Sequence, residues 1–174
     1  MNGGQNSREA IDRLFEQHGD EIYQFARFSL GNPIEAEDIV QDVFLQALRS
    51  WDVFRGDSSE RTWLWSITRH RLQDQFRQRR RQGNVDSGLD VNDLESVERS
   101  DPDTLLDLEH GLRHLSIAQR QVFTLRIVQD KSTSNTARIL GWSDIKVRVT
   151  LHRALKAMKH LLVQSEPLPE GEGN

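Results

Sequence analysis

Hydrophobic side chains recur at helical spacing along almost the whole chain. Over about residues 8–30 they predict one amphipathic helix, whose buried face would consist of Ile11, Leu14, Phe15, Ile22, Phe25 and Ala26. Gly31 follows this run and is suited to end the helix. The chain therefore opens with a long helix that must pack against other elements.

A second helix is predicted to begin directly afterwards. Asn32 is a good N-cap, Pro33 fits the first turn, and Glu35 stands three residues after the cap. The apolar stripe of this helix would be Ile39, Val40, Val43, Phe44, Ala47, Leu48 and Trp51. A turn-rich loop, FRGDSSE at 54–60, separates it from a third helix at about 61–82.

The helical pattern fails over residues 83–103 and then resumes. This stretch is rich in Asp and Glu and contains Gly and Pro, which predicts a flexible acidic linker. Four helical pieces are predicted from about 104 to 163, with Ser116, Ser132 and Ser143 as helix starts. Residues 164–174 predict a disordered tail. Because no convincing strand is present, we expect an all-α protein of two small helical domains, 1–82 and 104–163.

The composition fits small polar helical units and excludes several kinds of site. Of the 174 residues, 36% are hydrophobic and 29% are charged, which favours modest cores over one large globule. The absence of cysteine excludes disulfides and thiolate metal sites. No apolar run reaches the roughly 20 residues of a membrane span, and the N-terminus lacks an apolar signal segment. We therefore expect a cytoplasmic protein without direct membrane insertion.

The charge is unevenly distributed, although the formal net charge is only −4. Residues 55–81 carry eight basic side chains against three acidic ones, and residues 143–160 carry five against one. Between them, residues 84–109 carry nine acidic side chains against one basic one. Two cationic blocks therefore flank an anionic block, a pattern that the net charge alone would hide.

The third helix combines arginines with an aromatic residue on one side. At about 100° per residue, its buried side would hold Leu64, Ile67, Leu72 and Phe76. The opposite side would hold Trp63, Arg69, His70, Gln73, Asp74, Arg77 and Arg80. Arginine beside a ring that can stack on a base is typical of single-strand recognition. The alternative is a solvated basic face, with Trp63 tucked against a neighbouring helix.

The second helix carries polar side chains and one leucine on its outer face. These residues are Asp38, Gln41, Asp42, Leu45 and Arg49. An outward leucine among acids and an amide resembles a protein-docking surface with a small apolar anchor. The alternative is an ordinary solvated face with one stray leucine.

The segment 132–158 has the spacing of a helix-turn-helix. A small residue, Ala137, is followed four positions later by Gly141 and six further on by Val147. The inner stripe of the second helix would be Val147, Leu151, Ala154, Leu155, Met158 and Leu162. Its outward side chains, which are placed to enter a major groove, would be Lys146, Arg148, Val149, His152, Arg153 and Lys156. The alternative is a helical hairpin that binds no DNA.

Signs of catalysis are weak. His110 and His114 stand at a spacing that can hold a metal, but no third ligand is evident, and a polar helix with two histidines is the simpler interpretation. No phosphate-binding glycine loop, nucleophile elbow or catalytic cysteine is present. We expect no enzyme activity, no catalytic residue, no metal and no cofactor.

These motifs together resemble one family. EAEDIVQDVFLQAL, FRGDSSERTWLWSI and RQRRR resemble, in order and spacing, region two of the extracytoplasmic-function (ECF) sigma factors. LSIAQRQVFTLRI followed by ARILGWSDIKVRVTLHRA resembles region four. The resemblance covers about residues 10–163. The chain departs from the common pattern at His70, at Asn135-Thr136 and at Thr150, which leaves the base preferences open.

The resemblance implies a function in transcription initiation under the control of an anti-sigma factor. Region two would bind the β′ clamp helices of core RNA polymerase through Asp38, Gln41, Asp42 and Leu45. It would hold the opened minus-ten element of promoter DNA with Phe54, Arg55, Gly56, Asp57, Ser58, Ser59, Trp63, Arg69, His70, Gln73 and Arg77. Region four would contact the β flap and read the minus-thirty-five element with Lys146, Arg148, Val149, His152, Arg153 and Lys156.

Two other classes of protein fit parts of the pattern. A helix-turn-helix regulator could bind DNA without docking on polymerase. An interaction protein could mimic such a factor and bind only its regulator, in which case the basic faces would be idle. The outer face of the second helix distinguishes the first alternative, since only a sigma factor needs it for polymerase.

Overall fold

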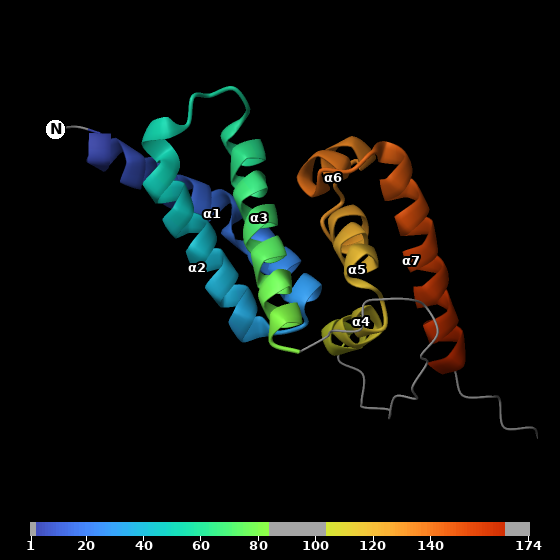
Figure 1. The fold of residues 1–174 in the computed structure, drawn as a ribbon. Coiled ribbons are helices and arrows are strands. Elements are labelled where there is room, and N and C mark those ends of the chain that lie inside the picture. Colours follow the sequence, from blue (N-terminus) through green and yellow to red (C-terminus); the bar gives the residue numbers. More distant parts are fainter. Residues whose placement is uncertain (1–2, 84–103, 166–174) are drawn as a thin grey trace, which may run out of the picture.

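The computed structural model describes residues 3–83 and 104–165, and every regular element in those ranges is helical. They form two groups of helices that lie side by side (Figure 1). The predicted all-α fold of two helical units is therefore confirmed for the described part of the chain. The predicted acidic linker, apart from Gly83, and the end of the predicted tail lie outside the described residues.

The first group is a three-helix bundle. Its elements are α1 (Gly3–Leu30), α2 (Pro33–Ser50), a 3-10 turn (Trp51–Val53) and α3 (Glu60–Arg81). The predicted cap of α2 is confirmed, because Asn32 Oδ1 accepts hydrogen bonds from the backbone N–H groups of Ile34 and Glu35. Ser59 caps α3 in the same way by accepting from the Thr62 N–H.

The second group contains four α-helices and one π-helical turn. Its elements are α4 (Thr104–Arg113), α5 (Ile117–Phe123), the π-helical turn (Thr124–Val128), α6 (Thr133–Leu140) and α7 (Asp144–Ser165). Ser116 and Gln119 form a capping box, and Ser132 caps α6. Ser143 accepts a hydrogen bond from the Lys146 N–H at the start of α7. All three predicted helix starts are confirmed.

The predicted apolar stripes are mostly buried, with three errors. Phe15 is exposed because no further element of the described residues covers that side of the bundle, and its ring packs edge-on against Phe44 with the ring centroids 5.0 Å apart. Leu48 on α2 is also exposed. Leu155 on α7 is exposed because α7 packs against the other helices along a narrower face than the pattern predicts. The side chain of Leu162 lies outside the described residues.

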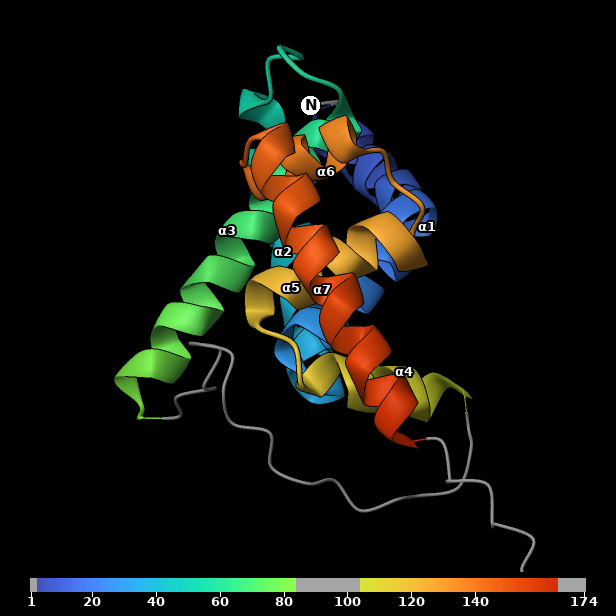
Figure 2. The ribbon, with the colours of Figure 1, turned by 90° about the vertical axis from the view of Figure 1, so that its right-hand side faces the viewer.

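The two groups share one continuous core. Trp65 and Phe25 of the first group belong to the same buried cluster as Leu125, Leu140 and Val147 of the second group. In Figures 1 and 2, α6 lies against the first half of α3, and α5 lies beside α1. The residues that the sequence assigns to two domains are therefore packed against each other in this structure.

Candidate functional site

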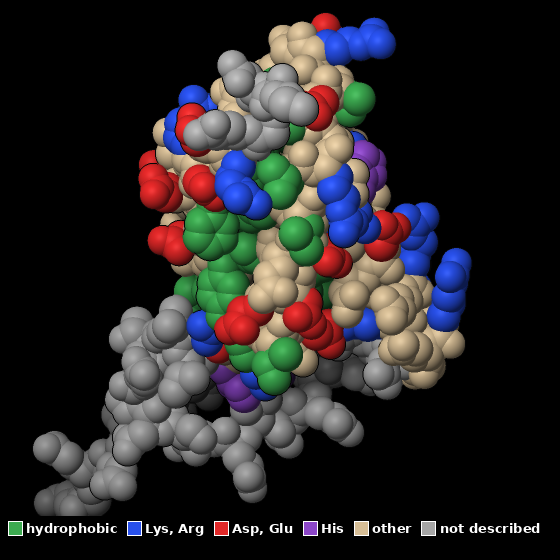
Figure 3. Space-filling model, turned by 90° about the vertical axis from the view of Figure 1, so that its left-hand side faces the viewer, with side chains coloured by type: hydrophobic (Ala, Val, Ile, Leu, Met, Phe, Trp, Pro, Cys, Tyr) green, Lys and Arg blue, Asp and Glu red, His purple; other side chains and the backbone are tan. Residues whose placement is uncertain are grey.

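The outer face of α2 presents acids and an apolar anchor to solvent. Asp38, Gln41 and Asp42 are exposed, and Leu45 is 50% exposed. We call these four residues the α2 face. Further exposed apolar side chains on α1 and α2 are Phe15, Ile34 and Leu48. Figure 3 shows apolar side chains in a band along this side of the molecule, with acidic side chains beside them. An apolar band with acidic neighbours is suited to bind another protein.

Three aromatic rings lie at the start of the loop between α2 and α3. The Phe54 ring centroid is 4.8 Å from that of Trp63, with an angle of 31° between the planes. Trp51 lies 5.8 Å from each of the other two rings. All three side chains are half-buried, whereas the loop residues 55–59 are exposed. Of the two interpretations of Trp63, the structure fits the one in which its ring is tucked against neighbouring elements, because the ring packs against Trp51 and Phe54 and against the core.

The predicted polar residues of α3 occupy different environments. His70 and Gln73 are exposed, and Arg77 forms an ion pair with Asp74 on the same helix. Arg69 is half-buried, and a Cβ on Gly141 would collide with its guanidinium group. Arg69 therefore lies against the turn of the helix-turn-helix rather than in open solvent.

Two other arginines of α3 have structural partners. Arg79 is largely buried, and its Nη2 lies 2.6 Å from Glu35 Oε2 and 3.0 Å from the Leu30 carbonyl oxygen. Arg71 donates a hydrogen bond of 2.8 Å to Gln46 Oε1. Part of the arginine cluster therefore ties α3 to α1 and α2, which the sequence pattern does not reveal.

The helix-turn-helix has the predicted geometry. Ala137 is buried where the two helices approach, and the Trp142 N–H donates to its carbonyl oxygen. Gly141 adopts the left-handed conformation with φ +67°, which favours glycine. Val147 is fully buried and fixes α7 on α6. The three spacing residues thus act as the sequence predicts.

The outward side chains of α7 are free to meet a partner surface. All six predicted residues are exposed: Lys146, Arg148, Val149, His152, Arg153 and Lys156. The Lys146 ammonium lies 4.0 Å from the centroid of the Trp142 ring, a cation–π contact at the start of the helix. The face therefore presents several cations and one apolar side chain over about three turns of the helix.

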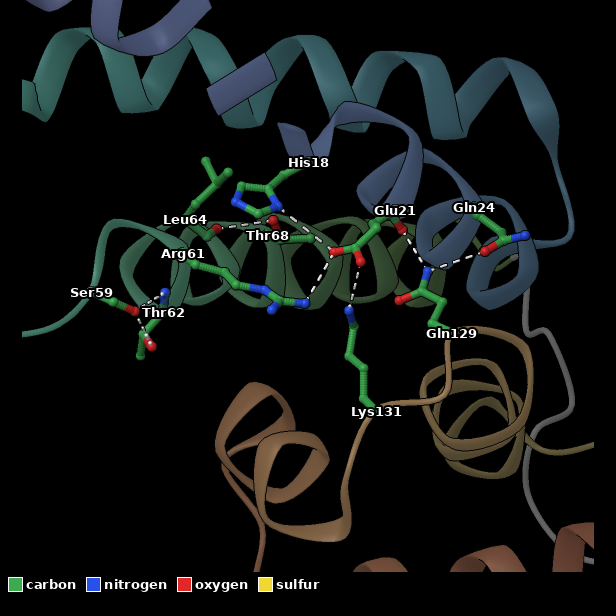
Figure 4. A network of polar contacts seen from close by, with 10 residues as sticks. All are labelled: His18, Glu21, Gln24, Ser59, Arg61, Thr62, Leu64, Thr68, Gln129 and Lys131. Atoms are coloured by element: carbon green, nitrogen blue, oxygen red, sulfur yellow. Dashed lines mark hydrogen bonds and ion pairs between the residues drawn. The ribbon is translucent and has the colours of Figure 1, made fainter. Parts of the chain in front are cut away.

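A charged network joins the two groups at Glu21 (Figure 4). Glu21 on α1 lies 3.1 Å from Lys131 Nζ, 3.4 Å from an Arg61 nitrogen and 3.8 Å from His18 Nδ1. Lys131 comes from the second group, and its ammonium also lies 5.3 Å from the Trp65 ring centroid. Glu21 therefore bridges cations from both groups.

Two side chains of the segment before α6, Gln129 and Lys131, contact the first group of helices. Asp130 has φ +47°, a conformation that is uncommon for residues other than glycine. On either side of it, Gln129 donates to the Glu21 carbonyl oxygen at 2.8 Å, and Lys131 reaches the Glu21 carboxylate.

A second ion pair, Arg27 with Glu109 at 2.5 Å, joins α1 to α4.

Burial changes the ionisation of two residues in this network. Desolvation is the largest effect on Lys131, whose side chain is 4% exposed, and it lowers the pKa of the ammonium although Glu21 opposes the change. Desolvation likewise lowers the pKa of His18 below 6.5, with Glu21 again acting in the opposite direction. Both groups are therefore easier to deprotonate in this structure than in water.

The described residues show no metal-binding cluster. The His110 and His114 rings lie 5.6 Å apart between centroids, and both side chains are exposed. In the ranges 3–83 and 104–165, no three His, Asp or Glu side chains are grouped so as to hold a metal ion. None of the helices described there is long and apolar enough to span a membrane.

Sequence reasoning missed the residues that join the two groups. Glu21, Gln129 and Lys131 interrupt no hydrophobic pattern and belong to no motif, so only the tertiary structure brings them together. The helical spacing predicts only that Trp51 belongs to an apolar stripe, because its contact with Trp63 depends on how α2 and α3 pack. The sequence of an arginine-rich helix does not tell which arginines are buried: Arg79 is bound within the bundle, whereas Arg77 is exposed.

Comparison with known families identifies the two groups of helices. Residues 14–82 match the family Sigma-70 region 2, and residues 105–158 match Sigma-70, region 4. A region 2 bundle followed by a region 4 helix-turn-helix defines a sigma-70-type transcription initiation factor.

Relatives place the chain more narrowly. It is 34% identical to the ECF RNA polymerase sigma factor SigX of Bacillus subtilis (strain 168), covering 94% of this chain and 90% of that protein. It is 32% identical to the RNA polymerase sigma factor YlaC of the same organism, covering 91% and 95%. The chain belongs to the ECF RNA polymerase sigma factors.

Solved structures share the fold. The sigma factor RpoE of Bartonella quintana, in a co-crystal structure with the anti-sigma factor NepR, aligns with a TM-score of 0.71 at 24% identity, covering 91% of this chain and 99% of that one. CnrH, in complex with the cytosolic domain of CnrY, aligns with a TM-score of 0.68 at 24% identity, covering 94% of each chain.

Proposed function

We propose that this chain binds core RNA polymerase and directs promoter-specific initiation of transcription. The observation that carries the proposal is the presence of both sigma-70 regions in one chain, together with an exposed α2 face and an exposed basic face on α7. In this function the chain performs no covalent chemistry and is not an enzyme. It acts in the cytoplasm, where polymerase and promoter DNA meet.

Each exposed surface has a separate task in this proposal. The α2 face binds the β′ clamp helices, because Leu45 offers an apolar anchor among acids that are accessible to solvent. The loop 54–59 and the outer side of α3 hold the opened minus-ten strand. The outward side chains of α7 read the minus-thirty-five duplex, and the second domain also contacts the β flap. Residues 1–82 and 104–163 are the two domains that carry these tasks.

An anti-sigma factor is the proposed inhibitor of this chain. Two of the structures that share the fold are complexes, one with an anti-sigma factor and one with the cytosolic domain of CnrY. A protein that binds the α2 face would compete directly with polymerase. The apolar side chains around that face give such a competitor a surface to bind.

The test is transcription in vitro with core polymerase, with mapping of the start sites. Wild type is expected to direct discrete start sites that core enzyme alone does not use. The double variant Asp38→Arg with Leu45→Asp is expected to abolish co-purification with core polymerase and transcription. A matched control, Asp20→Arg with Val163→Asp, changes an exposed acid and an exposed apolar residue on α1 and α7 and should leave both unchanged. A wild-type chain that neither associates with core enzyme nor directs any start site would refute the proposal.

A further inference from the structure

A pocket of about 210 Å³ lies between the start of α3 and α6, and we call it the inter-domain pocket. Its polar lining residues come from both domains: Ser59, Arg61 and Thr62 from the first, and Lys131, Asn135 and Arg138 from the second. In Figure 4, the first three lie on or next to α3, and Lys131 lies in the segment before α6. Ser59 also belongs to the proposed minus-ten loop, but the three cations belong to none of the surfaces proposed above.

Positive charge is in excess around the inter-domain pocket. Three of its lining residues are cations, and none of the described residues that line it is acidic. Lys131 and Arg61 share one carboxylate, that of Glu21, at 3.1 Å and 3.4 Å. Arg138 is exposed, and its Nη1 donates to Asn135 Oδ1 at 3.3 Å. Glu21 can offset only one of the three positive charges, so an anion in this pocket would be attracted by the other two.

The buried ammonium of Lys131 has hydrogen-bonding capacity to spare. Its side chain is 4% exposed, and its Nζ makes an ion pair with Glu21 but no hydrogen bond with the described residues. Desolvation and the nearby charge of Arg61 both lower the pKa of Lys131. A second anion beside Lys131 would oppose both effects and stabilise the charged ammonium.

The size and the donors of the pocket favour a phosphate group over other anions. Pockets for drug-sized ligands have volumes of about 300–1,000 Å³, so this one suits a smaller molecule. Both α3 and α6 begin at the pocket, with Ser59 as the cap of α3 and Asn135 in the first turn of α6. Helix N-termini and guanidinium groups are typical partners of phosphate. A tetrahedral phosphate can accept hydrogen bonds from both walls, whereas the two oxygens of a carboxylate lie in one plane.

We propose that the inter-domain pocket binds the phosphate group of a small molecule and that the bound phosphate holds the two domains together. Because the walls come from both domains, the site is complete only while the domains are packed against each other. A ligand that binds only this arrangement increases its population. Binding itself does not depend on the proposed function. Its consequence rests on that function: the ligand opposes transcription, because the domains must separate to reach two promoter elements.

Isothermal titration of the full-length chain tests the site, with inorganic phosphate and glycerol 3-phosphate as probes and sodium chloride keeping the ionic strength constant. Wild type should bind both probes. Arg61→Gln and Arg138→Gln should each weaken binding at least about tenfold, because each removes a charged donor. Arg8→Gln changes an exposed arginine on α1 and should bind as wild type does. Absence of binding to wild type, or equal binding by the two pocket variants, would overturn the site.

Transcription in vitro with core polymerase tests the closure. Saturating glycerol 3-phosphate should reduce transcription by wild type relative to sodium chloride at the same ionic strength, and it should not affect Arg138→Gln. An equal effect on both chains, or none on wild type, would overturn the closure. If single-stranded DNA but neither phosphate compound binds through Arg61 and Arg138, the pocket is part of a DNA-binding surface and the proposal is wrong. If wild type directs no start site without ligand, the proposed function fails, and the titration still decides whether the pocket binds phosphate.

Discussion

The strongest test of the interface between the two domains is the substitution Glu21→Gln. This change keeps the shape of the side chain and the backbone carbonyl oxygen that accepts from Gln129, but it removes the negative charge. Lys131 would then hold an ammonium group, 4% exposed, with no carboxylate 3.1 Å away. Arg61 would lose a partner at 3.4 Å, but it is close to half exposed and can turn to water.

The size of the effect follows from the burial of the two partners. Removing one partner of a fully buried ion pair costs about 3–5 kcal/mol. The Glu21 side chain is 35% exposed, so water screens part of the interaction, and the expected loss of unfolding free energy is about 1–2 kcal/mol. A fully exposed pair would contribute about 0–1 kcal/mol.

Urea denaturation followed by far-ultraviolet circular dichroism measures the loss. Glu60→Gln is the matched control, because Glu60 pairs with Arg13 at 2.7 Å within the first domain and both side chains are at least 39% exposed. This control should change the unfolding free energy by about 0.5 kcal/mol or less. A double-mutant cycle with Lys131→Met isolates the pair, and its coupling energy should be about 1–2 kcal/mol. Equal destabilisation by the two glutamine variants, or a coupling energy near zero, would refute the reasoning.

Three further predictions concern single positions. Gly141→Ala should lower the unfolding free energy by more than Gly83→Ala in urea denaturation, because both have positive φ but only Gly141 lies against Arg69, so equal losses would contradict the contact. Burial lowers the pKa of His18 in the folded protein below 6.5, so protonation of His18 costs folding free energy: the full unfolding free energy is present above pH 6.5 and falls as the pH drops through the folded-state pKa. His18→Gln should make the unfolding free energy less dependent on pH over that range. A dependence on pH equal to that of wild type would count against this prediction. Arg148→Ala should weaken binding of the C-terminal domain to duplex DNA and reduce the slope of log affinity against log salt by about 1, whereas an unchanged slope would mean that Arg148 touches no phosphate.

Local patterns predicted most of the fold, because caps, turns and helical spacing are local. Asn32, Ser116 and Gly141 each act within a few residues of their own position, and the role predicted for each is confirmed. Exposed faces were harder to predict, since an apolar residue at helical spacing is buried only if another element covers it. Phe15 is the example: its position fits the stripe, but nothing in the described bundle covers it completely.

The parts of the site that depend on tertiary contacts could not be read from the pattern. The helical spacing predicts that Trp63 lies on a helix, but its partners Trp51 and Phe54 come from a 3-10 turn and a loop. Lys131 is a buried charge in a short connecting segment, where a lysine would ordinarily be expected in solvent. Its burial depends on a carboxylate more than a hundred positions earlier in the chain, and one sequence contains no signal of that pairing.

The chemistry of the domain interface explains how a closed arrangement can serve a protein with two DNA-binding surfaces. In an interface made only of apolar contacts, the free energy needed to separate the domains rises with the buried area, because separation exposes all of that apolar surface to water. Here the shared core is supplemented by Glu21, Lys131, Arg27 and Glu109, whose charges water or another protein can satisfy after separation. Burial of Lys131 lowers the pKa of its ammonium and so opposes the charged form, which offsets part of the attraction to Glu21. Under the proposed function the two domains bind two separated promoter elements, and we therefore expect this interface to open when the chain binds polymerase and promoter DNA.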